Sequence, residues 1–104
     1  MAITSKQRSY LRGLANGIDS IFQVGKHGLT PELTESINEA LEKRELLKIT
    51  VLNNCDDDAR ELADIIHERT HSEIVQIIGK KIVLYRESKK NPKIELPKTK
   101  KKSI

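Results

Sequence analysis

Apolar residues recur along this chain at two different spacings, and the spacing predicts which segments are helices and which are strands. After the sequence Thr4-Ser5-Lys6-Gln7, which fits a helix-capping box, apolar residues follow three and four positions apart. These residues are Leu11, Leu14, Ala15 and Ile18. Gly17 stands where a left-handed cap would end the helix. The sequence therefore predicts a first helix between Thr4 and Gly17.

Two further helices are predicted by start signals followed by the same spacing. Thr30 can cap a helix whose first position is Pro31 and whose first turn contains Glu32, an acid at the positive end of the helix dipole. Its predicted buried positions are Leu33, Ile37, Ala40 and Leu41. The acidic run at residues 56–58 opens a third helix. The predicted inward positions of that helix are Ala59, Leu62, Ala63 and Ile66.

Short runs rich in β-branched residues predict strands. The four runs are residues 20–24, 46–52, 74–78 and 82–85. In the second run alternate residues share one side, and they are Leu47, Ile49 and Val51. Gly79-Lys80 joins the last two runs, with glycine at the first central position as a type II′ hairpin turn prefers. The order helix–strand–helix–strand–helix–strand–strand predicts an α/β (α+β) sandwich, in which three helices cover a mixed four-stranded sheet.

Length and composition exclude several classes of protein. The chain has 104 residues, of which 37% are hydrophobic and 33% charged, so it is one domain's length with a thin core. Its apolar runs are too short to span a bilayer, and its N-terminus lacks the apolar core of a secretory signal peptide. The single cysteine, Cys55, excludes an internal disulfide and a multi-cysteine zinc site. We therefore expect a cytoplasmic protein with no membrane partner.

Positive charge is concentrated near the C-terminus. Residues 86–104 hold eight Lys or Arg residues against Glu87 and Glu95, which is a net charge of +6. Since the whole chain carries +4, residues 1–85 carry −2. A basic segment of this kind suits a polyanion such as nucleic acid, although a solubilising terminus would have the same composition.

The sequence pattern also changes beyond Arg86. Lysine, proline and asparagine become frequent there, and the apolar periodicity ends. We therefore expect a folded domain over residues 1–86 and a basic, flexible C-terminal tail over residues 87–104. Ile94 and Leu96 could still dock part of this tail on the domain.

The loop Gly25-Lys26-His27-Gly28 has the residues of an anion-binding site. It joins a predicted strand to a helix N-terminus, where backbone N–H groups and the helix dipole both favour negative charge. Two glycines would let a ligand approach the backbone, and Lys26 adds a positive charge. KH domains grip nucleotide backbone with a G-x-x-G loop of this kind. The alternative is that the glycines serve the turn alone. The loop lacks the further residues of a Walker A or dinucleotide-binding motif.

Other basic side chains are candidates for the same surface, provided that the fold brings them near the loop. They are Lys6, Arg8, Arg12, Lys80, Lys81 and Arg86. Each of them taken singly is as easily explained as a solvated surface charge.

The aromatic residues limit the kind of nucleic acid. Tyr10, Phe22 and Tyr85 are the whole aromatic inventory, which is too small for a base-stacking platform. Binding should therefore depend on phosphates, 2′-hydroxyls and shape. Structured RNA is favoured over an unstructured strand.

One motif suggests an enzyme. His67-Glu68-Arg69-Thr70-His71 matches H-E-x-x-H, in which two histidines one helical turn apart bind zinc and the glutamate acts as a base. On the predicted helix, however, His67 lies at the boundary of the apolar face and His71 lies further out. The acids that follow Cys55 would disfavour its thiolate. We therefore expect no enzyme, no bound metal or cofactor, and no small-molecule substrate, with a zinc hydrolase as a remote alternative.

Several segments together resemble a known family. They are residues 11–15, 24–30, 45–48, 76–80 and 84–86, and they stand in the family's order. The chain is similar over residues 4–86 to a CRM domain (chloroplast RNA splicing and ribosome maturation), in particular to the stand-alone bacterial YhbY-type proteins. Ser20 differs from the proline that often precedes the first strand in the family.

The resemblance implies a fold similar to the C-terminal domain of translation initiation factor three. It also implies RNA binding through Gly25, Lys26, His27 and Gly28, and a role with precursors of the large ribosomal subunit. We therefore expect a non-enzymatic RNA-binding factor for ribosome assembly. An alternative is an adaptor whose acidic helix face binds a basic ribosomal protein. The residues of that face are Glu32, Glu35, Glu39 and Glu42.

Overall fold

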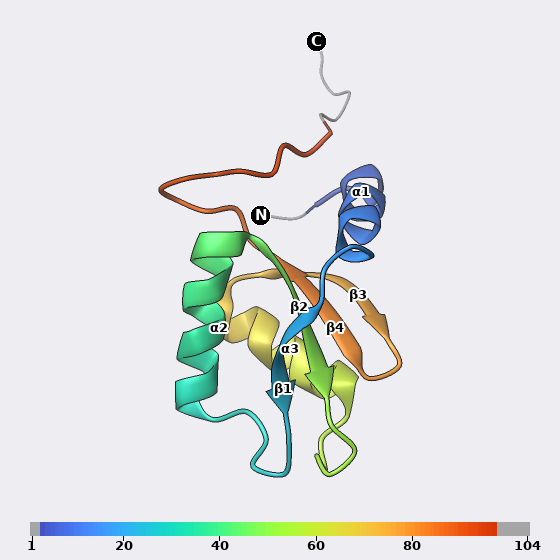
Figure 1. The fold of residues 1–104 in the computed structure, drawn as a ribbon, viewed down its shortest axis with the longest axis vertical. Coiled ribbons are helices and arrows are strands. Elements are labelled where there is room, and N and C mark those ends of the chain that lie inside the picture. The colour runs from blue at the N-terminus through green and yellow to red at the C-terminus, as the bar shows by residue number, and fades with distance from the viewer. Residues whose placement is uncertain (1–2, 98–104) are drawn as a thin grey trace.

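The computed structural model describes residues 3–97, and three helices and four strands follow one another there in the predicted order (Figure 1). The helices are α1 (Ser5–Ala15), α2 (Pro31–Arg44) and α3 (Ala59–Thr70). The strands are β1 (Ser20–Val24), β2 (Leu46–Val51), β3 (Glu73–Ile78) and β4 (Lys81–Tyr85). The predicted fold class is therefore confirmed. Among the described helices, none has the length and apolar character needed to cross a membrane.

The strands form one mixed sheet in the order β1-β2-β4-β3. β1 and β2 are parallel, whereas β4 is antiparallel to both of its neighbours. Because of these directions, three connections meet at one end of the sheet, which we call the loop end and which lies lowest in Figure 1. They are the β1–α2 loop (residues 25–30), the β2–α3 loop (residues 52–58) and the β3–β4 hairpin turn (residues 79–80).

α2 and α3 cover one face of the sheet and enclose a core with it. β2 contributes alternate residues to this core, and β4 contributes Ile82 and Leu84. The residues from β2 are Leu47, Ile49 and Val51, as predicted. All four predicted inward positions of α3 are buried there. In α2, Ile37 and Leu41 are buried, whereas Leu33 and Ala40 are only partly buried.

α1 lies on the opposite face and covers the half that is remote from the loop end. Leu11 and Ala15 pack in one cluster with Leu46, at the start of β2, and Tyr85, at the end of β4. Because β2 runs toward the loop end and β4 runs away from it, these positions lie at the far end of the sheet (Figure 1). The half of this face near the loop end is not covered by α1.

The two ends of α1 compare differently with the sequence. The predicted capping box is confirmed, since the Thr4 hydroxyl accepts from the Gln7 N–H at 3.1 Å and Gln7 Oε1 accepts from the Thr4 N–H at 3.0 Å. The predicted left-handed cap at Gly17 is wrong, because Asn16 is right-handed and Gly17 has no positive φ. Instead the Gly17 N–H bonds to the carbonyl of Leu14 at 3.1 Å, which ends the helix with a tighter turn. Leu14 itself is 38% exposed, so it lies outside the core.

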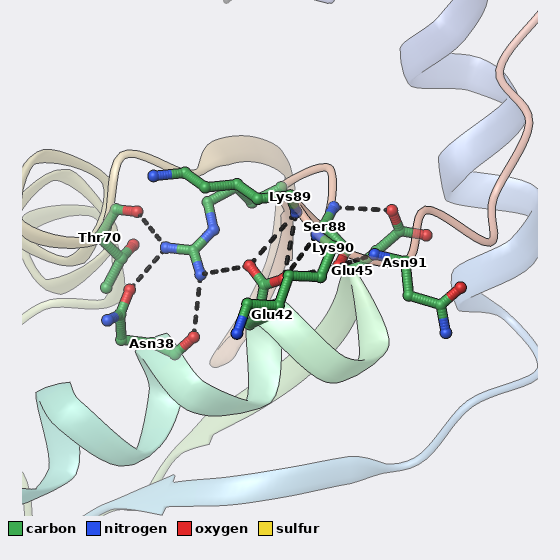
Figure 2. A network of polar contacts seen from close by, with 9 residues as sticks. Asn38, Glu42, Glu45, Thr70, Ser88, Lys89, Lys90 and Asn91 are labelled. Atoms are coloured by element: carbon green, nitrogen blue, oxygen red, sulfur yellow. Dashed lines mark hydrogen bonds and ion pairs between the residues drawn. The ribbon is translucent and has the colours of Figure 1, made fainter.

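Residues 88–97, which we call the C-terminal strap, are held by the buried side chain of Glu45. One carboxylate oxygen accepts a hydrogen bond from the Ser88 N–H at 2.8 Å (Figure 2). The other oxygen accepts from the N–H groups of Lys93 and Ile94, each at 2.8 Å. Glu45 has a φ of +68°, a region that residues other than glycine rarely adopt. Its three bonds to the strap help to hold this unfavourable conformation.

The strap corrects part of the prediction for the tail. We expected residues 87–104 to be flexible, but Glu45 anchors the first half, and Ile94 and Leu96 pack against the core under α1. Sequence periodicity could not show this, because the strap is neither helix nor strand and its partner lies more than 40 residues earlier. Residues 98–104 lie outside the described residues, so their predicted flexibility stays a prediction.

Candidate nucleic-acid interface

The G-x-x-G loop is a tight turn that leads into α2. The Gly28 N–H donates to the carbonyl of Gly25 at 3.0 Å, and Lys26 and His27 are exposed at the tip of the turn. The Thr30 hydroxyl then caps α2 by accepting from the Leu33 N–H at 3.1 Å, and Pro31 is the first helical residue, as predicted. The turn thus presents a lysine beside the positive end of a helix, as an anion site requires.

The two glycines of the loop are there for different reasons. Gly28 has a φ of +66°, and a Cβ at this position would lie 3.2 Å from a carboxylate oxygen of Asp57. Gly25 has no positive φ, and a Cβ there would meet the side chains of Asn54 at 3.4 Å and Leu52 at 3.6 Å, which are ordinary contacts. The fold therefore requires glycine at residue 28 but not at residue 25. A bare backbone at Gly25 is what a closely approaching ligand would need.

The β2–α3 loop lies beside the G-x-x-G loop, which sequence reasoning missed. The Leu52 N–H donates to the carbonyl of Val24 at 2.8 Å, so the two loops leave neighbouring strands together. Exposed Asp57 then stands near Gly28 and adds negative charge on that side, while Asp58 caps α3 through the Arg60 N–H at 3.3 Å. Only the parallel pairing of β1 and β2 makes these loops neighbours, and that pairing cannot be read from either loop alone.

Lys80 and Lys81 are the predicted basic residues that the fold brings to the loop end. Both side chains are exposed. The Val51 N–H donates to the carbonyl of Lys80 at 2.7 Å, which fixes the hairpin turn against the end of β2. Since β2 alone separates β4 from β1, the hairpin and the G-x-x-G loop are about 10 Å apart across the sheet.

The three predicted basic residues of α1 lie away from the loop end. Lys6 and Arg12 are exposed on the helix. Arg8 is partly buried, and its guanidinium donates to the carbonyls of Ile74 and Val75, where the pairing of β3 with β4 is irregular. The Arg8 side chain thus satisfies backbone groups of an edge strand. The structure therefore does not bring these residues together with the G-x-x-G loop.

Arg86 has partners within the protein. Its Nη1 donates to the side-chain oxygen of Asn38 at 2.5 Å and to the carbonyl of Thr70 at 2.7 Å. Its Nη2 donates to the carbonyl of Asn38 at 3.0 Å and lies 3.9 Å from a carboxylate oxygen of Glu42. The guanidinium thus joins α2, α3 and the chain beyond β4. We correct the predicted surface by leaving Arg86 out of it.

Glu42 belongs to the same network and is not free on the acidic face. Its carboxylate accepts from the Ser88 hydroxyl at 2.7 Å and from the N–H groups of Lys89 and Lys90 at 3.1 and 3.2 Å (Figure 2). These bonds, the Ser88 hydroxyl foremost, lower the pKa of Glu42. The acidic face predicted for an adaptor therefore retains three exposed residues, which are Glu32, Glu35 and Glu39.

The H-E-x-x-H motif does not form the two-histidine arrangement of a zinc enzyme. α3 ends at Thr70, and His71 follows it in the left-handed conformation, with a φ of +58°. His67 lies on the helix, and its ring Nδ1 is hydrogen-bonded to the carbonyl of Ser72. Residues 3–97 contain no group of three or more His, Cys, Asp or Glu residues that could hold a metal ion.

Comparisons with known proteins agree with this arrangement. The sequence model of the CRS1 / YhbY (CRM) domain matches residues 3–86. The chain is 47% identical over 95 residues to "Probable RNA-binding protein YqeI" of Bacillus subtilis, covering 91% of this chain and 99% of that protein. It is 34% identical over 95 residues to an "RNA-binding protein" of Haemophilus influenzae, covering 91% and 95% respectively.

A solved structure shows the same fold. The solution structure of the Staphylococcus aureus protein SAV1595 matches with a TM-score of 0.77 and 53% identity, covering 92% of this chain and 100% of that chain. The family model covers most of the chain, and the curated relatives are matched over nearly their whole length. The protein therefore belongs to the CRS1/YhbY (CRM) domain family.

Proposed function

We propose that this protein binds structured RNA at its loop end and catalyses no reaction. The observation that carries the proposal is the exposed Lys26-His27 turn at the N-terminus of α2, with Lys80 and Lys81 across the same end of the sheet. Backbone N–H groups, the helix dipole and three lysines there favour phosphate. The names of the relatives, which describe RNA-binding proteins, support the same ligand.

We further propose that the RNA is ribosomal and that the protein acts on precursors of the large ribosomal subunit in the cytoplasm, as an assembly factor. The resemblance to YhbY-type proteins supports this target. The exposed turn suits a folded RNA, because it offers contacts to phosphates and sugars but no aromatic platform for stacked bases. Lysines 98 and 100–102, which lie beyond the described residues, would add sequence-independent affinity.

Sedimentation of a cell lysate through a sucrose gradient tests this function. The wild-type protein should migrate with large-subunit precursors, and the Lys26→Glu variant should shift toward the top of the gradient. The Arg69→Glu variant is a matched control, because it makes the same charge change at an exposed position of α3. Wild-type protein that stays at the top of the gradient would contradict the ribosomal target, and equal migration of the two variants would contradict the role of the loop.

A further inference from the structure

The face of the sheet that α1 covers in part has an open half next to the loop end. Side chains alternate between the two faces of a strand, so residues next to those of the α2–α3 core point to this open half. In the row nearest the loop end, Gln23 pairs with Thr50, Thr50 with Lys81, and Lys81 with Ile78. The next row contains Lys48 and Gln76. We call these six residues the open sheet face, and they are Gln23, Lys48, Thr50, Gln76, Ile78 and Lys81.

The chemistry of the open sheet face suits nucleic acid. It combines two lysines with three side chains that can hydrogen-bond to phosphate or ribose, and it contains no carboxylate. Ile78 is 59% exposed and offers an apolar contact. Thr50 is bonded to the Ser20 hydroxyl at 2.6 Å, which orients it and leaves it further hydrogen-bonding capacity.

The charge of the rest of the molecule points to the same side. α2 and α3 present exposed carboxylates on the other side of the sheet. These are Glu32, Glu35, Glu39, Glu61, Asp64 and Glu68. α1, which borders the open sheet face, carries Lys6, Arg8 and Arg12 and has no acidic residue. Phosphate is therefore repelled from the helical side and attracted to the side of α1.

We infer that the open sheet face is a second contact surface for the RNA, continuous with the G-x-x-G loop. This inference rests on the proposed function. Gln23 stands two residues before Gly25, and Lys81 directly follows the hairpin turn, so one sugar–phosphate strand can cross from the loop onto the sheet. Lys48 and Lys81 meet phosphates, and Gln23 and Gln76 hydrogen-bond to ribose 2′-hydroxyls.

The test measures the dissociation constant of an RNA hairpin with an unpaired loop, and of the DNA hairpin of the same sequence, at several salt concentrations. Lys48→Ala should weaken RNA binding about fivefold at about 0.15 M salt and reduce the salt slope by about one, the effect of one lost phosphate contact. The double variant Gln23→Ala/Gln76→Ala should reduce the preference for RNA over DNA. Arg69→Ala is the matched control, because it removes one exposed positive charge from the helical side.

The outcomes separate this inference from the proposed function. If Lys26→Glu weakens binding and Lys48→Ala behaves like Arg69→Ala, the inference is wrong and the proposed function stands. If the wild-type protein binds neither hairpin, the proposed function fails. If Lys48→Ala weakens binding while Lys26→Glu does not, the sheet and not the loop holds the RNA.

A footprint on the unmodified full chain keeps the test independent of folding defects in the variants. Acetylation of lysines should be slowed by the RNA hairpin at Lys48 and Lys81 and unchanged at Lys43, which is exposed on α2. Equal acetylation of Lys48 with and without RNA would overturn the inference. In a lysate, protection of Lys48 that survives ribonuclease treatment would identify a protein partner and would also overturn it.

Discussion

Replacing Glu45 should release the C-terminal strap while leaving the rest of the domain folded. The carboxylate is fully buried and accepts three backbone N–H bonds of 2.8 Å, from Ser88, Lys93 and Ile94. In Glu45→Gln the remaining oxygen can still accept from Lys93 and Ile94, but the new NH₂ group faces the Ser88 N–H, and two donors then oppose each other.

The magnitude follows from these contacts. One hydrogen bond to a charged group is lost, which costs about 1.5–3 kcal/mol, and the buried N–H left without a partner adds about 1–3 kcal/mol. The free energy that docks the strap should therefore fall by roughly 3 kcal/mol, with an upper limit set by full release of the strap. The α2–α3 core takes no part in these bonds, so the sheet stays folded.

Amide hydrogen exchange of the full chain, followed residue by residue, measures this effect. Exchange at Ser88, Lys93 and Ile94 should accelerate by about 100-fold, which corresponds to the loss of roughly 3 kcal/mol, while β2 and β4 exchange as before. Glu45→Gly is the companion variant, because it suits the φ of +68° and still removes the acceptor. Unchanged exchange in the strap of both variants would refute the account of Glu45 as its anchor.

Three further predictions follow from the site and the cores. Gly25→Ala should keep the wild-type melting temperature and weaken RNA binding, whereas Gly28→Ala should lower the melting temperature by the cost of a strained φ, about 1 kcal/mol; equal melting temperatures of the two variants would contradict this. Truncation after Pro97 removes four lysines, so it should keep the melting temperature and reduce the salt slope of RNA binding by about three, whereas truncation after Arg86 also removes the strap and should lower the melting temperature; a stable protein ending at Arg86 would show that the strap contributes nothing. Burial, followed by the charges of two nearby carboxylates, raises the pKa of Tyr85 to about 12, so the unfolded chain releases this proton near pH 10 and the folded chain does not; the free energy of unfolding should fall by up to about 3 kcal/mol between pH 10 and 12, and a flat profile in urea titrations would exclude this.

Local signals in the sequence were sufficient for most of the fold. Thr4 and Thr30 cap their helices as predicted, because a cap depends on residues only three positions away. The buried positions of α3 and β2 follow from spacing alone. The end of α1 was predicted wrongly, since glycine at residue 17 was taken as a left-handed cap and the chain closes the helix without one.

The candidate site was predictable only where it is contiguous. The G-x-x-G loop and its place before α2 follow from the sequence, and so does the hairpin with Lys80. The contact of Asp57 with the loop and the internal role of Arg86 depend on strand order and on partners far along the chain. No local pattern distinguishes an arginine that binds RNA from one that bonds to Asn38 and Thr70.

The most direct test of the central claim is RNA affinity and melting temperature measured on one preparation of the Lys26→Glu variant. Lys26 is exposed and next to a helix N-terminus, where an acid is tolerated, so the melting temperature should not change. Affinity for structured RNA should fall by about 1–3 kcal/mol, from the loss of a charge-assisted contact and the added repulsion, and His27→Asp should act in the same direction more weakly. Arg69→Glu should leave affinity nearly unchanged. Unchanged RNA binding by a fully folded Lys26→Glu protein would contradict the claim and leave the G-x-x-G loop as a turn with no part in recognition.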